Sequence, residues 1–118
     1  MTIRPVIHLK RAYVAPGNKD GCRVLVDRIW PRGIKKDDLD LDHWLKEIAP
    51  SAELRKWFGH RDERWEDFRR KYREELDQHS DEVDFLRNLC DKKTVTLVYA
   101  ARDEDHNNAV VIKDYLGE

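Results

Sequence analysis

An apolar run that ends abruptly in polar and aromatic residues is the stretch of this chain best suited to chemistry. After Val-Leu-Val at residues 24–26 come four side chains that could bind a ligand: Asp27, Arg28, Trp30 and Arg32. A guanidinium group presents a planar fork of donors that suits phosphate or carboxylate, and a tryptophan face can stack on a base or on an arginine. Asp27 could orient one of the arginines. We therefore expect the end of this run to help form a site for an anion.

A second polar segment follows a later apolar run. After residues 94–100 the chain continues into a loop that carries Arg102, Asp103 and Asn107. Ligands of open parallel sheets bind beyond the carboxyl ends of the strands. If both runs are parallel strands, their loops lie at the same edge of the sheet. The sequence then predicts one pocket built from the two loops.

His60 is a further candidate, because the imidazole changes protonation near neutral pH and could act as a general base or a charged clamp. A solvent-exposed turn is the structural alternative, since His60 follows Gly59 and glycine commonly ends a helix. The histidines lack i,i+4 pairs and there is no Cys-x-x-Cys, so we expect no metal and no cofactor. The sequence also lacks a glycine-rich phosphate loop and a Gly-x-Ser-x-Gly elbow, so no catalytic residue is assigned.

The composition limits the classes of protein to which this chain can belong. Its 118 residues fit one domain, and 40% hydrophobic residues suffice for one core although another 40% are charged. Lys and Arg number 23 against 24 Asp and Glu, which argues against a general binder of nucleic acid. No stretch is apolar enough to cross a bilayer, and residues 1–5 lack the apolar core of a secretory signal. We therefore expect a cytoplasmic protein with no membrane partner.

The spacing of apolar residues predicts a mixture of strands and helices. Strands are expected at residues 3–14, 23–29 and 94–100. Helices are expected at residues 37–48, 52–58, 62–76, 80–90 and 109–116. Helical crossovers between strands favour an α/β fold: a small, mainly parallel sheet of three or four strands flanked by about five helices, in one domain over residues 1–118. Whether the first two strands pair with each other is left open.

Several segments of the sequence together resemble a known family. They are residues 23–33, 47–58, 65–68, 97–103 and 107–109. They are similar to the YeaO-like branch of the family called domain of unknown function 488, over almost the whole chain. The resemblance implies a fold but no established reaction. Longer relatives in the wider family carry cysteines at the later strand tip and loop. Residues 98–107 contain none here, which argues against catalysis by a thiol nucleophile.

The leading hypothesis is that the chain binds an anionic small molecule or a nucleotide at the carboxyl ends of its strands, with acid–base catalysis left open. The first alternative is a non-catalytic regulatory or protein-interaction module that uses Trp30 and Trp57, because Trp is enriched at interface hot spots. The second is nucleic-acid binding through Arg69, Arg70, Lys71 and Arg73, which fits less well because acidic residues alternate with them. The candidate ligand-binding residues are Asp27, Arg28, Trp30, Arg32, His60, Arg102, Asp103 and Asn107.

Overall fold

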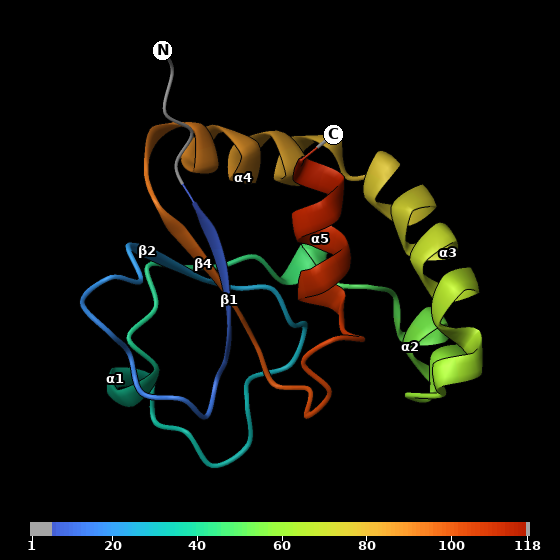
Figure 1. The fold of residues 1–118 in the computed structure, drawn as a ribbon, viewed down its shortest axis with the longest axis horizontal. Helices are drawn as coiled ribbons and strands as arrows, with labels where there is room; N and C mark the ends of the chain where they lie inside the picture. The colour runs from blue at the N-terminus through green and yellow to red at the C-terminus, as the bar shows by residue number, and fades with distance from the viewer. Residues whose placement is uncertain (1–5, 118) are drawn as a thin grey trace.

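The computed structural model describes residues 6–117, which are built around a four-stranded sheet with the order β1-β4-β2-β3 (Figure 1). Its strands are β1 (Ile7–Arg11), β2 (Cys22–Leu25), β3 (His43–Trp44) and β4 (Val95–Tyr99). All three pairings are parallel. The predicted small parallel sheet is therefore confirmed. The first two strands do not pair with each other, because β4 lies between them.

Helices connect the strands, as expected for an α/β fold. They are α1 (Lys36–Leu39), α2 (Ala52–Phe58), α3 (Trp65–Asp77), α4 (Ser80–Lys92) and α5 (Asn108–Leu116), with short 3-10 helices η1 (Lys46–Ile48) and η2 (Asp62–Arg64). Ser51 begins α2, because its hydroxyl accepts a hydrogen bond of 3.1 Å from the Leu54 N–H. No helix within residues 6–117 is long and apolar enough to cross a membrane.

The predicted helix over residues 37–48 is wrong. The helix ends after Leu39, because Asp40 adopts a left-handed conformation with φ 51°. Residues 43–44 then pair with β2 as an edge strand, and η1 follows. The helical spacing of apolar residues is real, but the sheet divides these residues between its two faces: Leu41 and Trp44 pack on one side, and Leu45 and Ile48 on the other. Strand pairing has overridden the local preference for helix.

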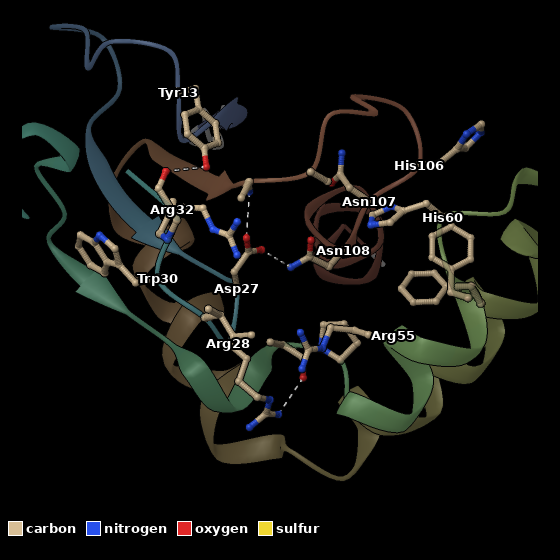
Figure 2. A pocket seen from close by; sticks show the side chains of 18 residues that line it. Tyr13, Asp27, Arg28, Trp30, Arg32, Arg55, His60, His106, Asn107 and Asn108 are labelled. Carbon is tan, nitrogen blue, oxygen red and sulfur yellow. Dashed lines mark hydrogen bonds between the residues drawn. The ribbon is translucent and has the colours of Figure 1, made fainter. Parts of the chain in front are cut away.

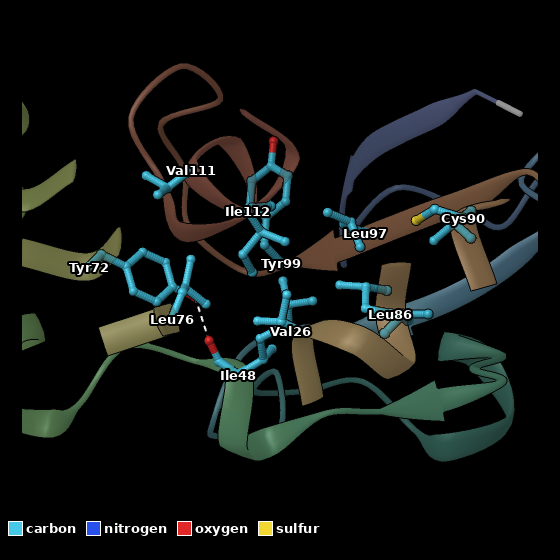
Figure 3. Close-up of a cluster of buried hydrophobic side chains, with 14 of the residues drawn as sticks. Val26, Ile48, Tyr72, Leu76, Leu86, Cys90, Leu97, Tyr99, Val111 and Ile112 are labelled. Carbon is cyan, nitrogen blue, oxygen red and sulfur yellow. Dashed lines mark hydrogen bonds between the residues drawn. The ribbon is translucent and has the colours of Figure 1, made fainter. Parts of the chain in front are cut away.

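The two faces of the sheet carry hydrophobic cores of different sizes. On the larger side, Leu97 and Tyr99 of β4, with Val26 just after β2, form one core with Leu86 of α4 and Ile112 of α5 (Figure 3). On the smaller side, Leu25 of β2 and Val98 of β4 pack with Ala12, which follows β1, and with Leu39 of α1. Figure 1 shows α1 apart from α3, α4 and α5. The carboxyl ends of the strands are therefore held rigidly from both sides.

A buried ionic network lies at the amino end of β2, on the smaller side of the sheet. Arg23 is only 3% exposed, and its Nη1 donates to Asp20 Oδ2 at 2.6 Å. Arg23 also donates to the carbonyl oxygens of Leu39 and Asp40, at 2.8 to 3.1 Å. The other Asp20 oxygen accepts a hydrogen bond of 2.7 Å from Lys10 Nζ. The network thus joins β1, β2 and α1 and leaves neither buried charge without a partner.

Acid is expected to remove the contribution of Asp20 to stability. Burial alone would raise the pKa of Asp20, but hydrogen bonds from Lys10, the Gly17 N–H and Arg23 outweigh it and lower the pKa from 3.8 to about 2. The native state therefore releases this proton more readily than the unfolded chain does. The stabilisation is complete above about pH 4 and is lost as the pH falls through about 2. Urea unfolding across this range should show a steeper loss of stability in the wild type than in Asp20→Asn. Equal slopes would contradict the assignment.

Candidate functional site

A pocket of about 470 Å³ lies at the carboxyl ends of the strands (Figure 2). The segments that follow β1, β2 and β4 all contribute to its lining, through Tyr13, Asp27 and Ala100 respectively. Helix α2 adds Arg55 and Phe58 to the lining. This is the edge at which parallel sheets bind ligands, and the volume is within the range of small-molecule sites.

Asp27 lies at the tip of β2, where two donors fix it. Its Oδ2 accepts a hydrogen bond of 2.9 Å from the Ala100 N–H, and its Oδ1 accepts one of 3.0 Å from Asn108 Nδ2. Asn108 Nδ2 also donates to the Val26 carbonyl oxygen at 2.9 Å. Burial raises the pKa of Asp27, opposed by the two hydrogen bonds and by the charge of Arg55. The carboxyl group therefore ties the ends of β2 and β4 to the start of α5.

Two arginines border the pocket with part of each guanidinium buried. Arg28 Nη2 donates to the Ala49 carbonyl oxygen at 3.3 Å, and Arg28 Nη1 lies 3.9 Å from a carboxylate oxygen of Glu47. The Nε atoms of Arg28 and Arg55 are buried and have no hydrogen-bond partner among the described residues. Figure 2 shows both side chains on the same part of the pocket wall. These two N–H groups can therefore donate hydrogen bonds to the oxygen atoms of an anion.

Trp30 and Arg32 border the same pocket from the loop after β2. The Trp30 Nε1–H donates to the Ile34 carbonyl oxygen at 2.7 Å, and the ring packs edge-on against Trp44 with centroids 5.3 Å apart. The Arg32 side chain is exposed. Its carbonyl oxygen accepts a hydrogen bond of 3.0 Å from Tyr13 Oη. Trp30 thus has a structural role as well as a place in the lining.

Histidines from two loops reach the pocket. His60 is exposed, adopts a left-handed conformation with φ 56°, and has its ring centroid 5.9 Å from that of Phe58. His106, which the sequence did not single out, lies with its ring centroid 4.9 Å from that of Trp65. Both residues belong to the pocket lining. The pocket lining therefore contains two imidazole rings from separate loops.

Of the three predicted site residues in the loop after β4, one lines the pocket and two do not. Asn107 lines the pocket, and its side chain begins α5 by accepting a hydrogen bond of 3.1 Å from the Val110 N–H. Asp103 lies outside the lining and organises the loop by accepting hydrogen bonds from the N–H groups of Asp105 and His106, which lower its pKa. The Arg102 side chain is exposed and also lies outside the lining.

One group of side chains in the described part of the chain has a spacing compatible with a metal ion. A ligand atom from each of Asp62, Asp103 and His106 lies within 4.8 Å of the others. His106 Nδ1 is 3.0 Å from Asp103 Oδ2 and 3.3 Å from Asp62 Oδ1. A hydrogen bond between His106 Nδ1 and Asp103 Oδ2 accounts for the shorter of these distances without a metal.

Sequence reasoning missed Arg55, Asn108 and Tyr13. Arg55 lies in a short helix among other charged residues, and nothing in the pattern marks which of them faces the sheet. Asn108 follows directly on Asn107, so one of the pair was predicted and its neighbour overlooked. These three residues could be assigned to the site only from the strand order, because that order places β1, β4 and β2 side by side.

Comparison with known proteins gives a consistent result. The model of a protein family described as "Inactive DUF488-N3 subclade" matches residues 6–118. The chain is 47% identical over 110 residues to "Uncharacterized protein YeaO" of Escherichia coli (strain K12), covering 93% of this chain and 96% of that protein. It is 43% identical over 110 residues to "Uncharacterized protein Rv3073c" of Mycobacterium tuberculosis (strain ATCC 25618 / H37Rv), covering 93% and 92%. No solved structure matches the chain significantly. The chain therefore belongs to the DUF488 family, in its YeaO-like branch.

Proposed function

We propose that this protein binds an anionic small molecule in the pocket at the carboxyl ends of β2 and β4. The observation that carries the proposal is the pair of buried Nε–H groups, on Arg28 and Arg55, that have no hydrogen-bond partner among residues 6–117. A buried donor left unsatisfied costs about 1–3 kcal/mol, so native structures rarely keep one without a reason. Oxygen atoms of a phosphate or carboxylate would satisfy both donors.

The charge of the pocket supports the same ligand class. Three arginines line it, Arg28, Arg32 and Arg55, against a single aspartate, Asp27. The hydrogen bonds to Asp27 come from Ala100 and Asn108, so this carboxyl group does not occupy the Nε–H donors of Arg28 and Arg55. Charge-assisted hydrogen bonds to an anion are about twice as strong as neutral ones.

The proposal is one of binding and includes no acid–base step. The matching family model describes its subclade as inactive, which agrees with a protein that binds a ligand without transforming it. Asp27, the half-buried carboxyl group of the pocket, has a structural role in accepting hydrogen bonds from the Ala100 N–H and Asn108. The cytoplasmic location expected from the sequence stays a prediction.

The alternative functions have less support, because their side chains already have partners within the chain. The Trp57 ring lies 5.2 Å from the Arg64 guanidinium and 4.3 Å from Lys71 Nζ. Arg69 pairs with Glu66 at 3.2 Å, and Arg70 pairs with Asp67 at 3.5 Å. A protein-contact surface or a nucleic-acid groove built from these residues would have to break such contacts first.

Calorimetric titration with inorganic phosphate and phenyl phosphate tests the proposal. We expect Arg28→Gln and Arg55→Gln each to weaken binding about 10- to 150-fold, because a hydrogen bond to a charged group contributes about 1.5–3 kcal/mol. Arg70→Gln is the matched control: Arg70 is exposed on α3, away from the pocket lining, and this variant should bind like the wild type. The proposal fails if the wild type binds neither a phosphate nor a simple carboxylate, or if all three variants bind equally well.

A further inference from the structure

We propose that the anion carries an aromatic ring, with the charged group at Arg28 and Arg55 and the ring against an apolar rim formed by Tyr13 and Ile29. This inference rests on the proposed function and names its ligand class: a planar ring bearing a phosphate or a carboxylate. A simple anion would need only the arginines. Binding of a simple anion would give no reason for apolar side chains to form this rim.

The rim is apolar and open to solvent. Ile29 is 64% exposed and Tyr13 is 49% exposed, and both border the pocket. They come from the segments after β2 and β1, so two separate loops each place a large apolar side chain at the same opening. Single exposed apolar residues are common on protein surfaces, but two that line the same pocket are typical of a binding site.

The Tyr13 ring is held in place at this opening. Its Oη donates to the Arg32 carbonyl oxygen at 3.0 Å, which joins the loop after β1 to the loop after β2. The Arg11 guanidinium lies 5.2 Å from the ring centroid. A ring fixed at both its hydroxyl and its face loses little freedom when a ligand packs against it. Figure 2 shows Tyr13 and Arg32 together on one side of the pocket.

The shape of the polar side chains around the opening favours a flat ligand over an alkyl chain. Besides Tyr13, the lining contains the imidazole of His60, the indole of Trp30 and the exposed guanidinium of Arg32. Each of these groups is planar, and rings and guanidinium groups stack on aromatic faces. On the inner side, Phe58 and Phe68 stack with centroids 4.4 Å apart and continue the apolar wall. The pocket lining thus contains both hydrogen-bond donors and flat apolar surfaces.

A ligand series measured by calorimetry separates this inference from the proposed function. The probes are inorganic phosphate, methyl phosphate, phenyl phosphate, adenosine monophosphate, acetate and benzoate. We expect phenyl phosphate to bind at least tenfold more tightly than methyl phosphate, and benzoate at least tenfold more tightly than acetate. Comparing the affinities for phenyl phosphate and adenosine monophosphate then shows whether the ring is a simple aromatic group or a nucleobase. Tighter binding of either compound agrees with the inference.

Variants of the rim test where the ring binds. In Ile29→Ser and Tyr13→Ser the advantage of phenyl over methyl phosphate should fall to threefold or less, while the affinity for methyl phosphate stays within twofold of the wild type. Val14→Ser is the matched control, because Val14 is 48% exposed beside Tyr13 but does not line the pocket. All three sites are exposed, so the variants should fold, and their melting temperatures check this.

The outcomes distinguish the two proposals. Equal binding of phenyl and methyl phosphate would overturn the aromatic ligand and leave anion binding intact. An aromatic advantage that survives in both rim variants would overturn the placement of the ring. If none of the six compounds binds the wild type, the proposed function itself fails, and this inference fails with it.

Discussion

Replacing Asp20 by asparagine is expected to lower the free energy of unfolding by about 3–5 kcal/mol. The substitution leaves the Arg23 guanidinium, which is only 3% exposed, without the carboxylate that lies 2.6 Å from it. A buried cation without its partner carries the full cost of desolvation. Lys10 also loses the negative charge that lies 2.7 Å from its Nζ. Equilibrium unfolding in urea, followed by circular dichroism, measures the change.

Two further variants make this prediction specific to the buried pair. Asp84 is exposed on α4, and Asp84→Asn should change the free energy of unfolding by no more than about 0.5 kcal/mol. In the double variant Asp20→Asn with Arg23→Met, both charges are gone, so part of the lost stability should return. If Asp20→Asn alone were as mild as Asp84→Asn, the network would not have the energetic role described above.

Local patterns predicted the helices well because their signals are short in range. The helix predicted over residues 62–76 is observed as η2 and α3, and Phe68, Tyr72 and Leu76 are buried at helical spacing along α3. The region between residues 37 and 48 was misread, because its apolar spacing satisfies a helix equally well. Only the pairing of residues 43–44 with β2, a contact between distant segments, separates the two readings.

The candidate site was likewise predictable from the sequence only in part. The tip of β2 was visible in the sequence, since Asp27 and Arg28 follow an apolar run directly. Arg55 was not visible, because its place in the pocket depends on how α2 packs over the strand tips. The role of Asp20 was not visible in the sequence either, because it lies within a cluster of turn-forming residues. Its hydrogen bond from Lys10 of β1 follows only from the tertiary fold.

Replacing Gly21 by alanine is expected to lower the free energy of unfolding by about 2–5 kcal/mol. Gly21 has φ 66°, and a residue with a side chain adopts this left-handed conformation at a cost of about 1–2 kcal/mol. An added Cβ would also lie 2.3 Å from the Thr94 carbonyl oxygen, and relieving such overpacking costs about 1–3 kcal/mol. Because that oxygen accepts a hydrogen bond of 2.9 Å from the Cys22 N–H, the clash falls where β2 meets β4. Urea unfolding measures the loss.

Gly33→Ala is the matched control, because it separates the cost of the backbone conformation from the cost of the clash. Gly33 has φ 82°, but nothing lies within 4 Å of an added Cβ. This variant should therefore lose only about 1–2 kcal/mol. Gly21→Ala should also weaken phenyl phosphate binding, since a shift of β2 against β4 moves Asp27 relative to the Ala100 N–H that holds it. Equal losses of stability in the two variants would show that β2 and β4 yield to the added methyl group without strain.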